Sequence, residues 1–175
     1  SSSSSSHPPP HSPLFDFEAT GVGAEWIDEF ARSTRSVIDV LDTPHVIVHT
    51  DWRGDNLRVD EAGTRVTAVY DWDSLRLHRE AIAAGEIAAM HSVDWSGPAD
   101  PYFATAEECV EFVAAIERHR RAPFTRDEWR AARAAIGFGW CYTARCEHAR
   151  ASVGADDPRF RMRERLAAEG RQLLS

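Results

Sequence analysis

The sequence predicts a mainly helical α+β domain in which a small β-hairpin region lies between helices. Three observations support this fold class. Residues 24–41 repeat apolar side chains at helical spacing, residues 45–70 contain short strand patterns, and the pattern is helical again from about Glu80. Because apolar residues recur every three to four positions in a helix and every second position in a strand, the change of period marks the change of structure.

The first predicted helix covers residues 24–41. Its apolar side chains share one face at helical spacing, and they are Trp26, Ile27, Phe30, Val37, Ile38 and Leu41. Residues 1–13 consist of six serines followed by a stretch rich in proline and histidine, which predicts disorder. We therefore expect a disordered start over residues 1–13 and one structured domain over residues 14–175.

The predicted β region contains strands at residues 45–48, 57–59 and 65–70. Residues 60–63 between the second and third strands have the composition of a tight turn, and Gly63 can adopt the positive φ that such a turn requires. The second and third strands should therefore form a hairpin.

The C-terminal half carries clear helix start signals. Thr105 with Glu108, and Thr125 with Glu128, have the spacing of capping boxes and each precedes a periodic apolar segment. The stripe expected on the helix after Thr125 is Trp129, Ala132, Ile136, Trp140 and Thr143. We expect prolines at the helix boundaries: Pro98 and Pro101 between the first two helices of this half, and Pro158 at the start of the last.

Composition excludes several classes of protein. Asp and Glu number 28 against 20 for Lys and Arg, so the net charge of −8 argues against nucleic-acid binding. No apolar run approaches the roughly 20 residues of a membrane span, and the start lacks a signal peptide. The three cysteines (Cys109, Cys141 and Cys146) are odd in number and form no C-x-x-C, which disfavours a disulfide scaffold or zinc site. A cytoplasmic location is expected.

The informative segment runs from His49 to Asn56 and has the form H-x-D-x-x-x-x-N, with Asp51 as its aspartate. It directly follows one predicted strand and directly precedes another. Fifteen residues after Asn56, at the end of the next strand, comes the run Asp71-Trp72-Asp73. The hairpin should bring Asp71 back beside Asn56, because adjacent strands lie about 5 Å apart.

These residue types suit phosphoryl transfer to a hydroxyl group. The transferred group carries charge on its oxygens, which Mg²⁺ neutralises. Carboxylates and amide carbonyls are the side-chain ligands that Mg²⁺ prefers. The attacking hydroxyl needs a carboxylate that orients it and accepts its proton. A loop with one Asp and one Asn, beside a strand end with another Asp, can supply these parts.

The pair HTDWRGDN and VYDWDS resembles the catalytic and metal motifs of the aminoglycoside phosphotransferase and choline kinase superfamily, which is similar to protein kinases. The resemblance implies a protein-kinase-like C-terminal lobe that uses Mg²⁺ and ATP, or another nucleoside triphosphate, to phosphorylate a small-molecule hydroxyl acceptor. It implies Asp51 as the catalytic base and His49 as the histidine that supports the loop. It implies Asn56 and Asp71 as nucleotide-side Mg²⁺ ligands. Asp73 matches an acidic position that often follows the metal aspartate, and we include it among the candidate metal ligands.

The chain departs from the family pattern in several places. Thr50 stands where the family usually has glycine, and Arg53-Gly-Asp55 stands where His-Pro-Gly is common. Glu86 is a shifted counterpart of the last aspartate in the segment after the metal site. The chain contains no lysine, although the family's nucleotide lobe uses one to hold the α- and β-phosphates. We therefore expect the N-terminal nucleotide lobe to be absent from residues 1–175.

Two alternatives remain open at this point. The first is a catalytically silent kinase-like lobe that acts as a binding or interaction module, which the missing lysine and phosphate loop favour. The second is a metal-dependent hydrolase built on four side chains: His49, Asp51, Asp71 and Asp73. It leaves Asn56 without a role.

The β region should also expose apolar side chains if no second lobe covers it. The candidates are Val46, Val48, Leu57, Val59, Val66 and Val69. Because a large uncovered apolar patch is unusual on a soluble monomer, we expect a separate N-terminal lobe, self-association, or residues 14–19 folded over the gap.

Overall fold

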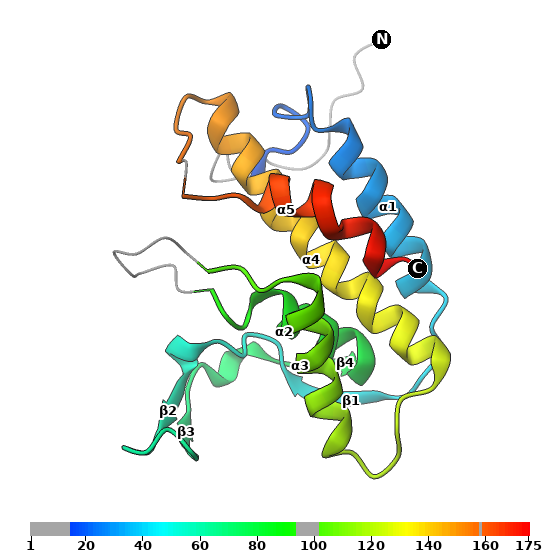
Figure 1. Ribbon diagram of the computed structural model, residues 1–175, viewed down its shortest axis with the longest axis vertical. Helices are drawn as coiled ribbons and strands as arrows, with labels where there is room; N and C mark the ends of the chain where they lie inside the picture. The colour runs from blue at the N-terminus through cyan, green and yellow to red at the C-terminus, as the bar shows by residue number, and fades with distance from the viewer. Residues whose placement is uncertain (1–14, 94–101, 158) are drawn as a thin grey trace.

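The computed structural model describes residues 15–93, 102–157 and 159–175, and these form a helical body with a small β region at one end (Figure 1). The helices are α1 (Glu25–Asp39), α2 (Glu80–Met90), α3 (Ala106–Arg118), α4 (Arg126–Ser152) and α5 (Met162–Glu169). The strands are β1 (His45–His49), β2 (Leu57–Val59), β3 (Val66–Val69) and β4 (Leu75–Arg79). The predicted mainly helical α+β class is confirmed.

Helix α1 confirms the first predicted helix, which it matches to within two residues at its C-terminal end. Its side chains at Ile27, Thr34 and Ile38 are buried, and the helix packs against α4. The buried side chains recur at helical spacing, so the amphipathic pattern is what places α1 on the body.

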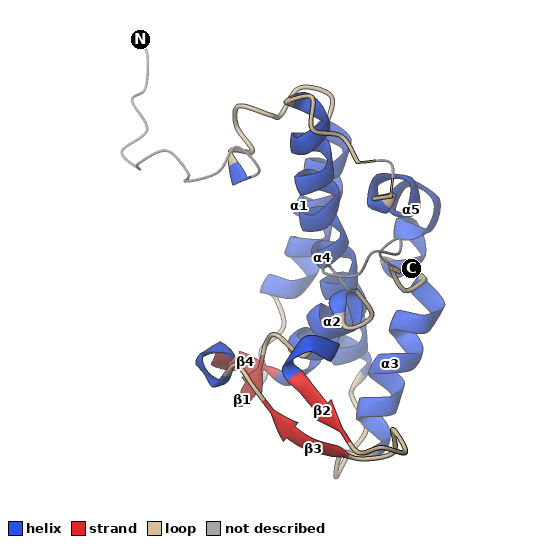
Figure 2. Cartoon of the chain, turned by 90° about the vertical axis from the view of Figure 1, so that its left-hand side faces the viewer, coloured by secondary structure: helices blue, strands red, loops and turns tan. Residues whose placement is uncertain are grey.

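The β region consists of two separate two-stranded antiparallel sheets (Figure 2). Strands β2 and β3 form the predicted hairpin, with Leu57 opposite Val69 and with Gly63 in the turn at a φ of 68°. Strand β1 pairs with β4, and His45 lies opposite Arg79. Strand β4 was not expected, although its leucines alternate with arginine and histidine as in a half-exposed strand.

Helices α2 and α4 meet along a seam of small residues. Nearly every side chain from Ala81 to Ala89 is buried or half-buried, so α2 is covered by neighbours on most of its surface. A Cβ atom at Gly85 would lie 2.1 Å from the backbone oxygen of Ala132. Glycine at this position is therefore what allows the two helix backbones to approach so closely.

Both predicted capping boxes are present. The Thr105 hydroxyl accepts from the backbone N–H of Glu108, the Thr125 hydroxyl accepts from that of Glu128, and each glutamate side chain returns a bond to the N-cap backbone. On the predicted stripe of α4, four side chains are buried and Trp129 is half-buried. The three expected boundary prolines, Pro98, Pro101 and Pro158, lie outside the described residues, and the last helix begins at Met162.

The segment before α1 is tied to the helical body by one buried arginine. Arg145 on α4 donates from Nη1 to the backbone oxygen of Thr20 at 2.9 Å and from Nη2 to that of Phe17 at 2.5 Å. Its Nε lies 3.0 Å from Asp28 Oδ1, and its guanidinium carbon lies 4.9 Å from the centre of the Phe17 ring. Arg145 thus contacts both the backbone of this segment and the first turn of α1, and His148 on α4 adds a 2.9 Å hydrogen bond to the backbone oxygen of Val22.

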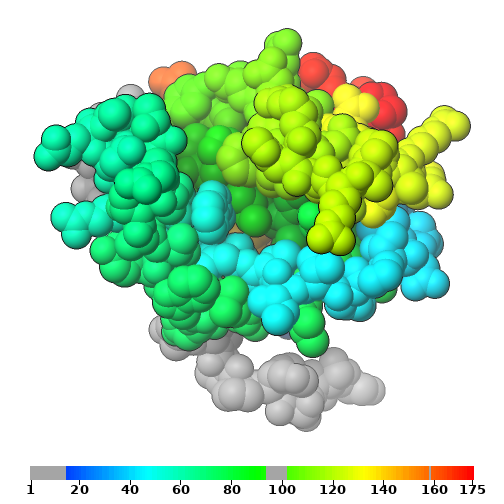
Figure 3. All heavy atoms as spheres, turned by 90° about the horizontal axis from the view of Figure 1, so that it is seen from below, coloured from blue at the N-terminus to red at the C-terminus, as the bar shows by residue number. Residues whose placement is uncertain are grey.

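The expected apolar positions of the β region divide into two groups. Val46, Val59 and Val66 are exposed, and Val48, Leu57 and Val69 are half-buried. A groove of about 330 Å³ opens between β1 and helices α2 and α3, on the lower face shown in Figure 3. The described part of the segment before α1 lies on α4, where Phe15 and Phe17 contact the ring of Tyr142.

The cysteines lie in the helices. Cys109 on α3 and Cys141 on α4 are buried, and burial raises the pKa of each thiol to about 12. Cys146, also on α4, is half-buried. Among the helices of the described segments, none combines the length and the apolar character needed to cross a bilayer.

Candidate active site

His49 is the last residue of β1 and begins the loop that carries the candidate catalytic groups. The side chain is buried, and its Nε2 donates a 2.8 Å hydrogen bond to the backbone oxygen of Tyr70 at the end of β3. The ring also packs edge-on against Trp52 and Trp72, with centroids 6.0 and 6.4 Å away. His49 therefore joins the loop after β1 to the end of the hairpin.

Asp51 lies half-buried in the same loop, and three donors surround its carboxylate. Arg53 donates from Nε to Oδ1 at 2.7 Å and from Nη2 to Oδ2 at 2.9 Å. Asn56 donates from Nδ2 to Oδ2 at 2.9 Å. These bonds, with the Arg53 bond contributing most, hold the pKa of Asp51 below its ordinary value.

The side-chain amide of Asn56 is oriented by Asp51. Its Nδ2 also donates to the Asp51 backbone oxygen at 2.8 Å, so both of its hydrogens point toward Asp51. In the described part of the chain, no donor reaches the Asn56 Oδ1 atom. The amide oxygen therefore keeps its acceptor capacity and is the atom of this side chain that can meet a cation.

Asp71 is brought beside Asn56 by the hairpin. The Tyr70 N–H donates to the backbone oxygen of Asn56 at 2.9 Å, and Asp71 follows in the left-handed conformation with φ 63° and ψ 50°. Aspartate tolerates this conformation better than most residues, and the Ser74 hydroxyl donates to Asp71 Oδ2 at 2.8 Å. Asp71 is exposed, so its carboxylate is accessible to solvent.

Asp73 contacts the Asp71 side chain. A hydrogen bond with Asp73, then one from Ser74, holds the pKa of Asp71 below its ordinary value, and the electrostatic effects of the nearby His49 and Arg53 side chains act in the same direction. The negative charge of Asp71 in turn raises the pKa of Asp51 slightly against the larger effects there. The candidate base and the candidate metal ligands thus lie close enough together to interact electrostatically.

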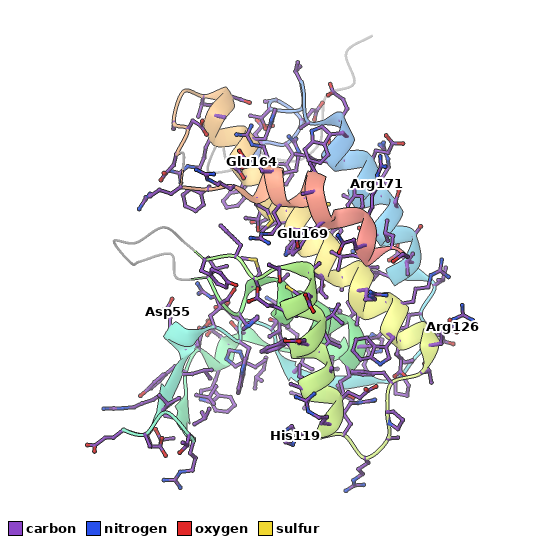
Figure 4. All side chains as sticks on the ribbon, in the orientation of Figure 1. Asp55, His119, Arg126, Glu164, Glu169 and Arg171 are labelled. Atoms are coloured by element: carbon purple, nitrogen blue, oxygen red, sulfur yellow. The ribbon has the colours of Figure 1, made fainter. Side chains whose placement is uncertain are left out.

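Arg53 is a site residue that the sequence motif did not single out. Besides its two bonds to Asp51, its Nη1 lies 3.8 Å from Asp55 Oδ2, and Asp71 also contributes to the negative field around it. Asp55 itself sits at the outer turn before β2 (Figure 4). The only available sequence signal was the two-residue step from Asp51 to Arg53 in a loop, which many surface loops share.

Replacing Arg53 by glutamine is expected to raise the pKa of Asp51 toward its ordinary value of 3.8, because the largest cause of its lowering is removed. Asp51 has a lower pKa in the folded chain than in the unfolded chain. The ion pair therefore stabilises the fold above about pH 4, and this contribution is lost as the pH falls through the folded-state value.

A ¹³C NMR titration of the aspartate carboxyl groups measures this shift directly. The exposed Arg58 on β2 provides the matched control, since Arg58→Gln should leave the titration of Asp51 unchanged. An Asp51 that titrates at the same pH in wild type and Arg53→Gln would contradict the assigned cause.

The predicted Mg²⁺ ligands would supply only part of a coordination shell. In residues 15–93, 102–157 and 159–175, no group of three or more His, Cys, Asp or Glu side chains is placed to hold a metal ion. Asn56 and Asp71 offer an amide oxygen and a carboxylate. Mg²⁺ at phosphate sites often takes only one or two carboxylates from the protein and completes its shell with water and phosphate oxygens. The residues present fit that manner of binding.

Glu86 on α2 faces the same region from the helical body. Its Oε2 lies 3.0 Å from His78 Nε2 on β4. Glu86 and Asp51 both line a cavity of about 500 Å³ between the loop and helices α2 and α4. The residue expected as a shifted acidic counterpart thus lies beside an acceptor-sized space next to the candidate base.

The family model described as Phosphotransferase enzyme family matches residues 7–79. This confirms the resemblance read from the motifs, and it is consistent with the aminoglycoside phosphotransferase and protein-kinase-like superfamily. The matched segment contains the loop, the hairpin and the Asp71-Trp72-Asp73 run, and it ends at the last residue of β4. No curated protein and no solved structure matches the chain. The family match supports a kinase-like enzyme family.

Proposed function

We propose that the chain carries the catalytic half of an ATP-dependent phosphotransferase that moves a γ-phosphoryl group to the hydroxyl of a small molecule. One observation carries the proposal. Asp51, Asn56 and Asp71 come from a loop and a hairpin in the family-matched segment, and hydrogen bonds join these elements at one edge of the β region.

In this proposal Asp51 orients the acceptor hydroxyl and accepts its proton. A carboxylate has about four acceptor positions. Arg53 and Asn56 occupy three of them in the structure, two on Oδ2 and one on Oδ1. The remaining position on Oδ1 suits a substrate hydroxyl, so the base can act without breaking its ion pair.

Mg²⁺ would be held by the Asn56 amide oxygen and the Asp71 carboxylate, with Asp73 close to Asp71. When bound, the ion neutralises the charge on the phosphate oxygens of ATP. His49 has a positioning role, because its bond to the Tyr70 oxygen fixes the distance between the loop and the strand that leads to Asp71.

We assign residues 14–175 to a protein-kinase-like C-terminal lobe. The order of catalytic loop, hairpin and helical body supports the assignment. In that architecture a second lobe holds the nucleotide with a lysine, and this chain has none. We infer that an N-terminal lobe outside these residues, or a second copy of the chain, supplies the nucleotide-binding groups. A cytoplasmic location fits an ATP donor.

Manganese binding tests the metal half of the proposal. Mn²⁺ added to the ¹⁵N-labelled chain should broaden the amide signals of Asn56, Asp71 and Asp73 before others. Asp71→Asn should remove this selective broadening. The matched control is Asp39→Asn, which changes a carboxylate on the exposed face of α1. Broadening centred elsewhere, or unchanged in Asp71→Asn, contradicts the assigned ligands.

Asp51→Asn separates the base from the metal site. This variant should keep the Mn²⁺ response and lose any phosphoryl transfer, because the base acts on the acceptor. We expect little ATP turnover from the 175 residues alone. Robust turnover that Asp51→Asn abolishes would overturn the lobe assignment and support the catalytic role of Asp51. Turnover unaffected by Asp51→Asn would overturn that role.

The competing candidate is a catalytically silent lobe, and the absence of lysine favours it. It predicts at most weak Mn²⁺ binding and no phosphoryl transfer that depends on Asp51, so Asp51-dependent transfer decides between the two. The hydrolase alternative has less support, because the described residues offer no three-membered metal cluster and the oriented Asn56 amide has no part in it.

A further inference from the structure

The cavity beside Asp51 has a defined set of walls. It encloses about 500 Å³, a volume within the range of small-molecule sites. The loop after β1 forms one wall, and helices α2 and α4 form the others. Its lining side chains are Thr50, Asp51, Trp52, Arg53, Glu86, Ile87, Met90, Phe138 and Tyr142, with Gly139 between the last two.

The helical walls of this cavity are mainly apolar. Ile87 and Met90 line it from α2, and Phe138 and Tyr142 line it from α4. The Tyr142 ring is backed by Phe17, with ring centroids 6.1 Å apart, so the segment before α1 fixes that aromatic wall. A ligand in this space would bury apolar surface against aliphatic and aromatic groups.

Three charged side chains line the cavity, Asp51, Arg53 and Glu86, and each has a polar partner. Asp51 is bound at both oxygens by Arg53, and Glu86 lies 3.0 Å from His78. A polycationic ligand loses hydration at each ammonium group when it enters such a space, and it needs unpaired carboxylates as compensation. Because Arg53 neutralises Asp51, Glu86 is the one lining carboxylate left to compensate an ammonium group, which is fewer than a polycation needs.

We propose that this cavity is the acceptor site and that it takes a hydroxyl compound with an uncharged, largely apolar body rather than a polycationic amino sugar. This inference rests on the proposed function in one respect: that function requires the acceptor hydroxyl to point toward Asp51. The apolar body lies between α2 and α4 against Ile87, Met90 and Tyr142. Thr50 and Glu86 provide polar contacts at the rim.

Binding to the 175-residue chain tests the proposal without requiring turnover. Two probes are compared by NMR chemical-shift titration: 4-phenyl-1-butanol, a neutral alcohol with an apolar body, and neamine, a polycationic amino sugar. The alcohol should shift signals of residues that line the cavity and bind at least about tenfold more tightly than neamine. Neamine that binds more tightly at the cavity overturns the proposal.

Variants of the walls locate the binding. Ile87→Asp should weaken alcohol binding at least about tenfold, because it places an unpaired charge against the apolar body. Should Ile87→Asp fail to fold, Tyr142→Ser serves instead, since Tyr142 is half exposed, and a loss of about fivefold is expected. Leu77→Asp, on the exposed face of β4, is the matched control and should change nothing. Alcohol binding that survives both wall variants overturns the proposal.

The two proposals fail in different experiments. Alcohol binding that depends on the cavity walls, without a Mn²⁺ response at Asn56 and Asp71, contradicts the phosphotransferase reaction and supports the cavity as an apolar alcohol site. A Mn²⁺ response together with preferential binding of neamine contradicts the acceptor class and leaves the reaction supported.

Discussion

Arg145→Met is expected to lower the free energy of unfolding by about 3 kcal/mol. Arg145 is 2% exposed, and its guanidinium is the donor to the backbone oxygens of Phe17 and Thr20. Hydrogen bonds from a charged group contribute about 1.5–3 kcal/mol each, and their loss leaves two carbonyl groups without this donor. The expected loss of stability lies near the lower end of the range for breaking a buried ion pair, because the Asp28 side chain is 44% exposed and remains hydrated without its partner.

Denaturant unfolding of wild type and Arg145→Met measures the effect. Arg161→Met is the matched control, since that arginine is 73% exposed and its pair with Glu164 contributes less than about 1 kcal/mol. Limited proteolysis should cut the segment before α1 faster in Arg145→Met than in wild type. Equal stability and equal cleavage would show that this segment is held by other contacts.

Gly85→Ala is expected to destabilise the fold by about 3 kcal/mol, at the upper end of overpacking effects. In an unhindered helix the same change would stabilise by about 1 kcal/mol through helix propensity. Here the new methyl group would lie 2.1 Å from the Ala132 oxygen and 2.9 Å from the Ala135 Cβ. Backbone atoms cannot rotate aside, so α2 and α4 would have to separate.

Thermal or chemical unfolding gives the sign of this change. Gly54→Ala is the control, because no atom lies within 4 Å of a Cβ built there. Its effect should stay within about 0.5 kcal/mol, as for surface positions in general. A Gly85→Ala protein at least as stable as wild type would mean that α2 can shift along α4 at little cost.

Much of the fold could be predicted because each signal was local. Helix α1 followed from apolar periodicity, and the starts of α3 and α4 followed from capping boxes within four residues. The β2–β3 hairpin followed from a glycine turn between two short apolar runs. Strand β4 escaped prediction because its partner β1 lies far away in sequence, and strands take their stability from that partner.

The candidate site was likewise predictable where the contacts are local in sequence and not where they depend on distant residues or on side-chain conformation. The motif placed Asp51, Asn56 and Asp71 on a loop and a hairpin whose geometry is local. The pairing of Arg53 with Asp51 depends on side-chain conformations, and the contact of Phe17 with Tyr142 joins residues that are distant in sequence. No periodicity or spacing in the sequence encodes either contact, so both had to come from the structure.

The seam of small residues between α2 and α4 affects how the preference for an acceptor molecule can change from one related chain to another. The cavity lies directly above it, with Ile87 on one helix and Phe138 on the other. A Cβ at Gly139 would lie 2.9 Å from the Ala89 Cβ, so glycines on both helices set the helix spacing. Substitutions at the seam would widen or narrow the cavity without touching a ligand. Related chains could thus come to accept larger or smaller alcohols through mutations hidden beneath the binding surface.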